Sequence, residues 1–241
     1  MRRTVLILQA RIKSKRLPGK VLKELLPGRS LLSLTLERLR LVRAADEIVV
    51  AIPEGDSDDP VAREAEAAGV SVYRGSEEDV LGRYLAAARK FRAELLVRMT
   101  ADNPLCDPAT VDLHIHRMCE CYHRADLVTN MLRQSFPYGL AVEVMPLDSL
   151  ERMARLSTTA DLREHVTTLA YERPEWFSIE PVLDDCDRSG MRWTVDYPED
   201  LEFVRAVFRG LYSAGHVFDK RGILEFLLQH PAVAAINSHV R

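Results

Sequence analysis

The stretch Thr4-Val5-Leu6-Ile7-Leu8-Gln9-Ala10 decides the fold, because it is an almost unbroken run of apolar residues near the start of the chain. Such a run is typical of a strand that is covered on both faces, as the strands of parallel sheets are. A polar loop over residues 11–20, a helical pattern over about 31–42 and a second apolar run over about 46–52 follow. Together they predict a β-loop-α-β unit whose first strand is central in a sheet.

The same alternation continues as far as Pro108. A helix is expected over about 59–68, a strand over about 70–74, a helix over about 78–92 and a strand over about 95–99. A parallel sheet with helices on both faces is the simplest fold for this pattern.

The pattern becomes mixed beyond Pro108. Helices are expected over about 109–122, 147–156, 161–172, 198–212 and 219–229, and extended segments over about 126–129, 139–145, 177–182 and 191–195. The sequence Ser-Phe-Pro-Tyr-Gly at 135–139 interrupts regular structure. We therefore expect one α/β domain over residues 1–241, with a small, partly antiparallel excursion around 126–182 that serves as a flap or in dimerisation.

Composition excludes several classes of protein. The 241 residues are 47% apolar, and 33 basic against 36 acidic residues give a net charge of −3, so no overall charge favours nucleic acid or an anionic membrane. The apolar run over residues 5–8 is far shorter than the ~18 residues of a membrane span or the ~7 of a signal-peptide core. Four cysteines do not make a disulfide framework in a chain of this length. We expect a cytoplasmic protein with neither a nucleic acid nor a membrane as its partner.

Charge is nevertheless uneven, because residues 1–43 hold 12 basic and only 2 acidic residues. The loop after the first strand is where an open α/β sheet places its ligand. This loop lacks the glycine patterns of dinucleotide-binding folds and of P-loops, which weakens the case for hydride transfer and for P-loop hydrolysis. Its cations and one hydroxyl suit a triphosphate, and Pro18-Gly19 is expected to turn Lys20 back toward the same anion. These side chains are Arg11, Lys13, Ser14, Lys15, Arg16 and Lys20.

Five ordered blocks carry a family resemblance: A-R-x-x-S-x-R-L-P-G-K-V-L over 10–22, and the stretches over 74–81, 98–107, 163–167 and 193–202. They resemble the cytidylyltransferases that make CMP-activated sugar acids, most closely the branch that acts in spore coat polysaccharide biosynthesis. The resemblance implies a Rossmann-like three-layer α/β/α nucleotidyltransferase fold, an Mg²⁺-dependent enzyme and a homodimer.

Two acidic residues are candidate metal ligands. Asp102 follows the strand expected over about 95–99, and Asp196 follows the extended segment expected over about 191–195, so both lie at the sheet edge that carries the basic loop. Mg²⁺ takes one or two carboxylates and completes its shell with phosphate oxygens and water. The alternative is that each aspartate only caps the helix that follows it.

The resemblance implies that a sugar-acid hydroxyl attacks the α-phosphorus of CTP, so that pyrophosphate leaves and a CMP-sugar forms for surface or spore-coat polysaccharide. No dedicated base is evident, and a metal-bound alkoxide near Asp196 is one route. The expected catalytic residues are Arg11, Arg16, Lys20, Asp102 and Asp196. The expected nucleotide contacts are Gln9, Ala10, Arg11, Ser14, Lys15, Gly75, Ser76, Asp79, Arg83, Arg98 and Thr100. The expected acceptor contacts are Arg163, Glu164 and His165, for which a solvated helix face is the alternative.

Besides a surface variation at Arg29-Ser30, two positions depart from the family pattern. Lys13 stands where the family usually has glycine, so either the backbone approaches phosphate differently or Lys13 adds a contact. Gly82 stands where an aspartate is expected. The preference for CTP over the other nucleoside triphosphates therefore stays open. Two other functions also stay open: a sugar-nucleotide-dependent glycosyltransferase of related fold, and a catalytically silent nucleotide-binding or scaffold homologue.

Overall fold

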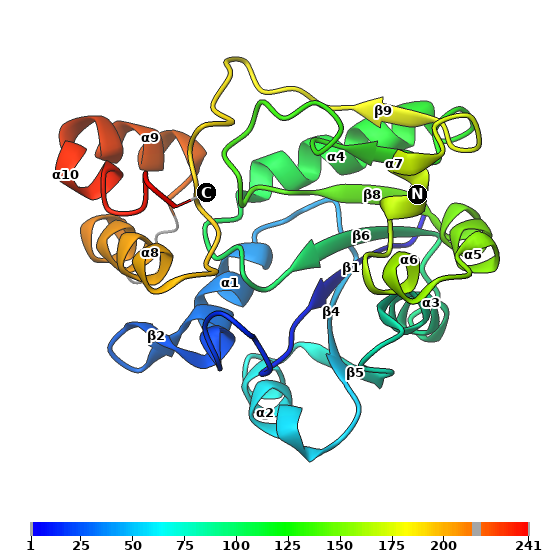
Figure 1. Cartoon of the computed structure of the whole chain (residues 1–241), viewed down its shortest axis with the longest axis horizontal. Helices are drawn as coiled ribbons and strands as arrows, with labels where there is room; N and C mark the ends of the chain where they lie inside the picture. Colours follow the sequence, from blue (N-terminus) through cyan, green and yellow to red (C-terminus); the bar gives the residue numbers. More distant parts are fainter. Residues whose placement is uncertain (1, 214–217, 241) are drawn as a thin grey trace.

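The computed structural model describes residues 2–213 and 218–240. Within them, a seven-stranded sheet in the order β5-β4-β1-β6-β8-β7-β9 runs through the centre of the molecule, with helices on both of its faces (Figure 1). Its strands are β1 (Thr4–Gln9), β4 (Glu47–Pro53), β5 (Ser71–Gly75), β6 (Leu95–Thr100), β7 (Leu127–Thr129), β8 (Glu143–Pro146) and β9 (Ile179–Pro181).

The first strand is central, as its sequence predicts. β1 pairs in parallel with β4 on one side and β6 on the other, and β4 pairs in parallel with β5. β8 is antiparallel to both β6 and β7, and β9 is parallel to β7. The sheet is therefore mostly parallel with an antiparallel part, and the mixed pairing expected beyond Pro108 is confirmed.

Side chains of β1 alternate between two cores. Leu6 and Leu8 pack into one apolar cluster and Val5 and Ile7 into the other, and all four are fully buried. Each such side chain contributes about 1.5–3 kcal/mol of hydrophobic stabilisation. The first cluster is covered by α1 (Leu31–Leu39), α2 (Asp59–Ala67), α4 (Pro108–Cys121), α8 (Pro198–Leu211) and α9 (Lys220–Gln229). The second is covered by α3 (Val80–Lys90), α5 (Leu147–Leu156) and α7 (Thr168–Glu172).

Two expected elements differ in the structure. The helix expected over 161–172 is divided into α6 (Ala160–Glu164) and α7, because Val166 between them has a positive φ of 48° that no helix accommodates. The segment expected as a strand over 191–195 is not one, because its backbone bonds to loops instead of a neighbouring strand. The Tyr138 amide donates to the Met191 carbonyl at 2.8 Å, and the Val195 amide donates to the Asp102 carbonyl at 2.8 Å.

Gly139 allows these loops to approach each other. Its φ is +116°, and a Cβ atom on it would lie 2.5 Å from the backbone nitrogen of Thr194. Only glycine fits such a position, because any side chain would meet backbone atoms that cannot move aside. The contact fixes the segment that leads to Asp196 at the end of the sheet.

A few elements lie outside the sequence-based expectations. They are the hairpin of β2 (Glu24–Leu26) and β3 (Arg29–Ser30), the short helix α10 (Pro231–Ala234), and the 3-10 helices η1 (Lys20–Leu22) and η2 (Asp56–Asp58). Across residues 2–213 and 218–240, no helix is both long enough and apolar enough to cross a bilayer.

Candidate active site

A cleft of about 540 Å³ opens at the carboxyl ends of β1 and β6, where the sequence places the ligand. Most of the predicted catalytic and nucleotide residues line it: Gln9, Ala10, Arg11, Ser14, Lys15, Arg16, Lys20, Thr100, Asp102 and Asp196, together with Glu164 from the predicted acceptor group. Lys13, Val21 and Ala101 complete the lining. The basic loop and both acids therefore share one site.

A tight turn aims Lys20 into this cleft. Gly19 has a φ of +67°, in the left-handed region that glycine adopts readily, and its amide donates to the Ile12 carbonyl at 3.0 Å. The chain then enters η1, whose first residue is Lys20. The turn predicted from Pro18-Gly19 thus directs Lys20 toward the cleft, as expected.

The Lys20 ammonium joins the two acids. Its Nζ donates to Oδ2 of Asp102 at 2.9 Å, to Oδ1 of Asp196 at 2.9 Å and to the Val195 carbonyl at 2.8 Å. An ammonium has three N–H donors, so all of them are used. Asp102 and Asp196 come from segments about ninety residues apart, yet both carboxylates meet at this one nitrogen.

Asp102 is held as a carboxylate. Burial acts to raise its pKa, but the Lys20 charge and a hydrogen bond from the Thr100 hydroxyl, 2.6 Å from Oδ1, outweigh burial and lower the pKa below its ordinary value. The group is therefore ionised at neutral pH and suits cation binding rather than proton donation.

The alternative that Asp102 and Asp196 only cap the helices that follow them is wrong. The residue that caps α4 is Asp107, whose carboxylate accepts from the Thr110 amide at 2.9 Å. At the start of α8 the carboxylate of Asp200 accepts from the amides of Asp196 and Tyr197. The Asp102 and Asp196 carboxylates are thereby left to face the cleft.

Asp196 is surrounded by Arg16, whose role the sequence predicts, and by three residues with no predicted role: Arg192, Tyr197 and Asp200. Nη2 of Arg192 lies 3.3 Å and Nη2 of Arg16 lies 3.4 Å from Oδ2 of Asp196. Arg192 also pairs with Asp200, and Nη1 of Arg16 donates to the Tyr197 hydroxyl at 3.3 Å. For Arg192 and Asp200 the only signal in the sequence is their position, four residues before and four residues after Asp196, from which they could orient it.

Lys13 lines the cleft but is already paired. Its Nζ lies 2.7 Å from Oε2 of Glu77, and this hydrogen bond lowers the pKa of Glu77. The departure from glycine at this position therefore brings a charge that an acid of the neighbouring loop balances.

The remaining predicted residues lie outside the cleft lining. Arg83 is buried and donates to the Ser76 carbonyl, close to Gly75, and Arg98 pairs with Glu143 of β8. His165 lies 3.5 Å from Asp161 on its own helix. The structure thus brings together the residues that the sequence predicts for triphosphate and metal binding, but not all of those predicted to contact the nucleotide and the acceptor.

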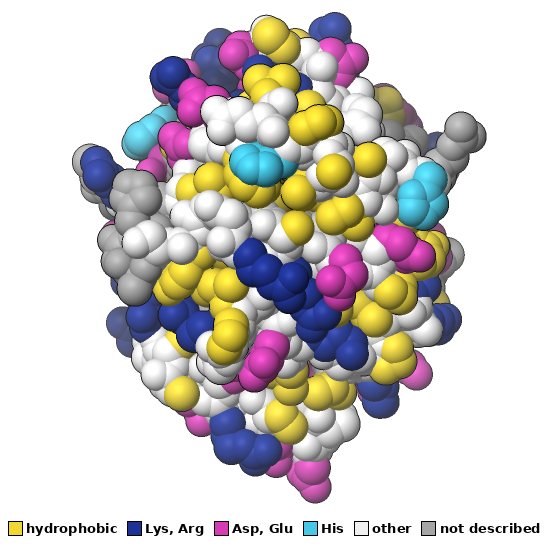
Figure 2. All heavy atoms as spheres, turned by 90° about the vertical axis from the view of Figure 1, so that its left-hand side faces the viewer, with side chains coloured by type: hydrophobic (Ala, Val, Ile, Leu, Met, Phe, Trp, Pro, Cys, Tyr) yellow, Lys and Arg dark blue, Asp and Glu magenta, His cyan; other side chains and the backbone are white. Residues whose placement is uncertain are grey.

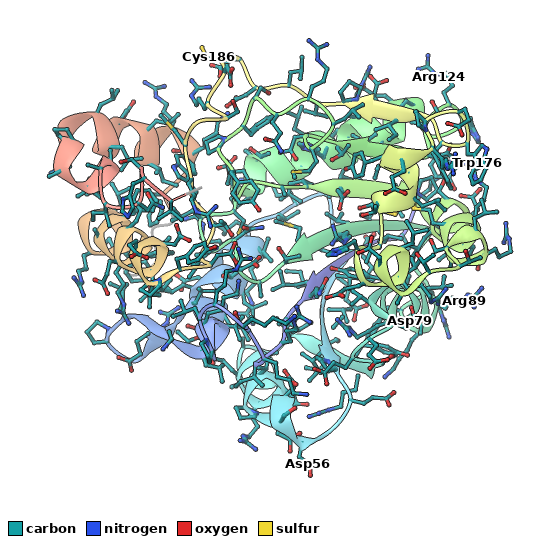
Figure 3. All side chains as sticks on the ribbon, viewed as in Figure 1. Asp56, Asp79, Arg89, Arg124, Trp176 and Cys186 are labelled. Atoms are coloured by element: carbon teal, nitrogen blue, oxygen red, sulfur yellow. The ribbon has the colours of Figure 1, made fainter. Side chains whose placement is uncertain are left out.

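Arg163 joins two elements instead of facing the cleft. Its guanidinium pairs with Asp79, which lies beside α6 in Figure 3, and donates to the Ala154 carbonyl of α5 at 3.2 Å. Asp79 also caps α3, since its Oδ1 accepts from the Gly82 amide at 2.8 Å. Arg163 therefore fixes α6, whose last residue Glu164 lines the cleft.

Gly82→Ala is expected to lower the free energy of unfolding by about 0.5–2 kcal/mol, the usual cost of losing a helix cap. A methyl group there would lie 2.3 Å from Oδ2 of Asp79, so the cap must rotate away and release Arg163. Gly222→Ala is the matched control, because Gly222 has the same place in α9 and its methyl group would lie 3.4 Å from the capping Asp219. This control should gain about 0.5–1 kcal/mol. Urea unfolding of both variants measures the difference, and an equal gain in both would contradict the contact.

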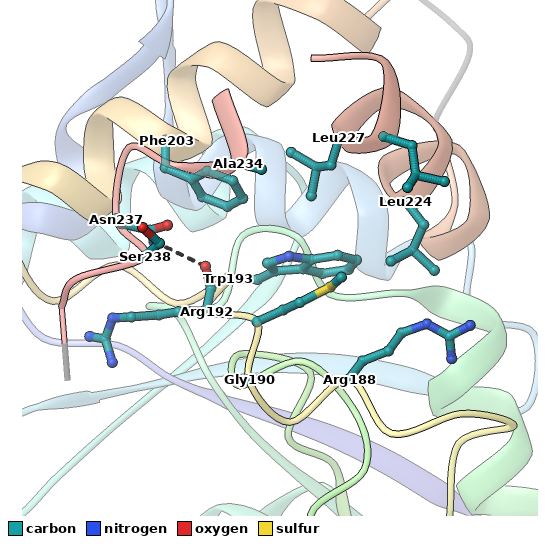
Figure 4. Close-up of a pocket in the computed structure, with 12 residues that line it drawn as sticks. Arg188, Gly190, Arg192, Trp193, Phe203, Leu224, Leu227, Ala234, Asn237 and Ser238 are labelled. Carbon is teal, nitrogen blue, oxygen red and sulfur yellow. Dashed lines mark hydrogen bonds between the residues drawn. The ribbon is translucent and has the colours of Figure 1, made fainter. Parts of the chain in front are cut away.

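A second cavity, of about 390 Å³, lies between α8, α9, α10 and the segment 188–193. Figure 4 shows Phe203, Leu224, Leu227 and Trp193 around it, while the guanidinium groups of Arg188 and Arg192 point away. Figure 2 shows the outer face of this region, where apolar side chains form small groups among basic and acidic ones. Both arginines are paired with acids, Arg188 with Asp184 and Arg192 with Asp200, so this cavity is less suited to a polyphosphate than the cleft is.

The two-acid arrangement fits Mg²⁺. Among the residues that the structure describes, no group of three or more His, Cys, Asp and Glu side chains could hold a metal alone. Two carboxylates that converge on one cationic nitrogen have the chemistry that suits an ion whose other ligands come from phosphate and water.

Comparison with known proteins bears on the family and the fold of the chain. A family model described as cytidylyltransferase matches residues 5–216. The spore coat polysaccharide biosynthesis protein SpsF of Bacillus subtilis is 31% identical over 211 residues, which are 84% of this chain and 85% of that protein. A cytidylyltransferase structure from Leptospira borgpetersenii superposes with a TM-score of 0.92 at 29% identity, over 97% of both chains.

A more distant structure shares the fold. It is a CMP:2-keto-3-deoxy-manno-octonic acid synthetase complexed with CTP, with a TM-score of 0.68 at 18% identity, over 86% of this chain and 99% of that one. The architecture is thus the Rossmann-like nucleotidyltransferase fold that the sequence implies.

Proposed function

The chain belongs to the cytidylyltransferase family, and from this premise we propose that it transfers CMP from CTP to a hydroxyl of a sugar acid, releasing pyrophosphate. The observation that carries the proposal is the meeting of the basic loop with Asp102 and Asp196 in one cleft. The name of the Bacillus subtilis relative supports a place in surface polysaccharide biosynthesis. The CTP complex of the more distant synthetase supports the nucleotide and the kind of acceptor.

The triphosphate binds the basic side of the cleft. Arg11, Lys15 and Arg16 line this side, and the Ser14 hydroxyl adds a hydrogen-bonding group. In phosphoryl transfer the protein mainly positions the reactants and stabilises charge on the nonbridging oxygens, and these cations perform that task. No covalent nucleophile is needed.

Gln9 is proposed to contact the base. Its Oε1 is buried without a hydrogen-bond partner among the described residues, and the residue lines the cleft. An unpaired buried acceptor is costly, so a ligand that supplies an N–H donor is favoured there. The exocyclic amino group of cytosine is such a donor, whereas uracil offers a carbonyl at the same place.

Asp102 and Asp196 are proposed to hold Mg²⁺, which when bound neutralises phosphate charge and makes pyrophosphate a better leaving group. Arg192 and Asp200 orient Asp196, and the Thr100 hydroxyl orients Asp102. Of the three residues predicted to contact the acceptor, Glu164 is the one that lines the cleft. Its carboxylate is proposed to accept a hydrogen bond from an acceptor hydroxyl.

The test is pyrophosphate release from CTP and Mg²⁺ in the presence of a panel of sugar acids. We expect release with at least one of them, and slower release with ATP, GTP or UTP. Release of a nucleoside diphosphate from a sugar nucleotide would instead identify a glycosyltransferase. Nucleotide binding without any turnover would identify a silent homologue.

Thermal stabilisation gives a second measurement that needs no acceptor. CTP with Mg²⁺ at a hundred times its Kd is expected to stabilise the fold by about 2.7 kcal/mol. If the four nucleoside triphosphates stabilised the protein equally, the proposed preference for cytosine would be wrong.

A further inference from the structure

The environment of Lys20 is that of a bound cation. Its Nζ has three oxygen partners at 2.8–2.9 Å, two of them carboxylate oxygens, and its side chain is only 11% exposed. The third partner is a backbone carbonyl, that of Val195. Oxygen ligands of this kind are also the ones that Mg²⁺ takes.

The ammonium and a divalent ion cannot share this position. Asp102 and Asp196 both direct an oxygen at Nζ, so an ion held by the two carboxylates would lie in contact with the ammonium. Like charges at such a distance repel strongly where water is partly excluded. A divalent ion can therefore enter only if Lys20 leaves.

The Lys20 side chain has an alternative position within the same cleft. Lysine carries its charge on a flexible four-carbon stem. Lys20 borders the same cleft as Arg11, Lys15 and Arg16, where a triphosphate would offer new oxygen partners. Without nucleotide the partners of the ammonium are the two acids and the Val195 carbonyl, and bound nucleotide would offer it an alternative.

We propose that Lys20 is an internal placeholder for the metal: it neutralises Asp102 and Asp196 in the free protein and moves to the triphosphate when nucleotide binds, so that the divalent ion enters with the nucleotide and not before it. This inference rests on the proposed function, because it takes the two acids as the metal ligands. It makes metal and nucleotide binding cooperative, and such coupling is reciprocal.

The experiment measures Mn²⁺ binding by electron paramagnetic resonance, with and without CTP and in the absence of acceptor. Wild-type protein is expected to bind Mn²⁺ at least tenfold more weakly without CTP than with it. Lys20→Met is expected to bind Mn²⁺ at least tenfold more tightly than wild type without CTP, and to gain less from CTP. Lys23→Met is the matched control, since Lys23 ends the same turn without a contact to either acid.

A second readout follows the fold itself. Removing Lys20 leaves two carboxylates facing each other, so Tm of Lys20→Met should fall, and Mg²⁺ alone should restore it. Tm of wild type and of Lys23→Met should not respond to Mg²⁺ alone. If Lys20→Met does not fold, Lys20→Gln removes the charge but keeps an N–H donor in the site, and the same measurements apply to it.

The outcomes separate the two claims. Wild-type protein that binds Mn²⁺ equally well with and without CTP would overturn the placeholder inference while leaving the metal site in place. Absence of Mn²⁺ binding in every variant, with and without CTP, would overturn the proposed metal site and the inference with it.

Discussion

Replacing Asp196 with asparagine is expected to lower kcat for pyrophosphate release about 10²- to 10³-fold, a range typical of losing one group that stabilises transition-state charge. The amide has the shape of the carboxylate, and the backbone bonds to Asp200 do not involve the Asp196 side chain, so the fold should persist. What is lost is one of the two carboxylates that meet at Lys20. The measurement is turnover at saturating CTP and Mg²⁺, with circular dichroism as the check on folding.

Asp56→Asn is the matched control for this change. Asp56 lies in η2 at the outer edge of the molecule beyond α2 (Figure 3), far from the cleft lining. Its turnover should equal that of wild type. An Asp196→Asn protein that kept more than half of wild-type turnover would remove Asp196 from the catalytic set.

The largest expected loss of stability comes from Arg98→Met. Arg98 pairs with Glu143, whose side chain is only 4% exposed and also accepts a hydrogen bond from the Tyr171 hydroxyl at 2.7 Å. Burial opposes the guanidinium charge, but Glu143 outweighs it and raises the pKa of Arg98. Removing one partner of a buried pair strands the other charge and costs about 3–5 kcal/mol. Chemical denaturation at neutral pH measures the loss.

Two controls identify the cause of that loss. Arg89→Met breaks the pair with Glu151, in which the arginine is 59% exposed, and should cost less than about 1 kcal/mol. The double variant Arg98→Met with Glu143→Gln removes both charges and should recover much of the loss. Equal losses for Arg98→Met and Arg89→Met would show that the buried pair contributes no more than a surface one.

The core of the fold was predictable because its signals are local. The apolar run over 4–10 and the strand–helix alternation up to Pro108 depend on neighbours in sequence, and β1, β4, β5 and β6 all lie where the pattern predicts them. The turn at Gly19 is equally local, which is why the direction of Lys20 could be anticipated.

The errors have long-range causes. The extended segment over 191–195 has a strand-like sequence, but it meets the loop over 135–139, which no local pattern reveals. Val166 is fully buried at a positive φ, so packing there overrides the local preference of a β-branched residue and divides the predicted helix. Arg163 pairs with Asp79, which is 84 positions away in the sequence, and therefore does not face the cleft. The homodimer and the single-domain organisation stay predictions.

The contact between Lys20 and Asp196 spans 176 positions of the chain. Bringing two such distant parts of the chain together costs conformational entropy before the contact can stabilise the fold. Contacts of this kind therefore slow folding. During synthesis the β-loop-α-β unit emerges well before the segment that carries Asp196. The cleft proposed to bind nucleotide and metal is therefore a late product of folding, because it is incomplete until the segment that carries Asp196 has left the ribosome.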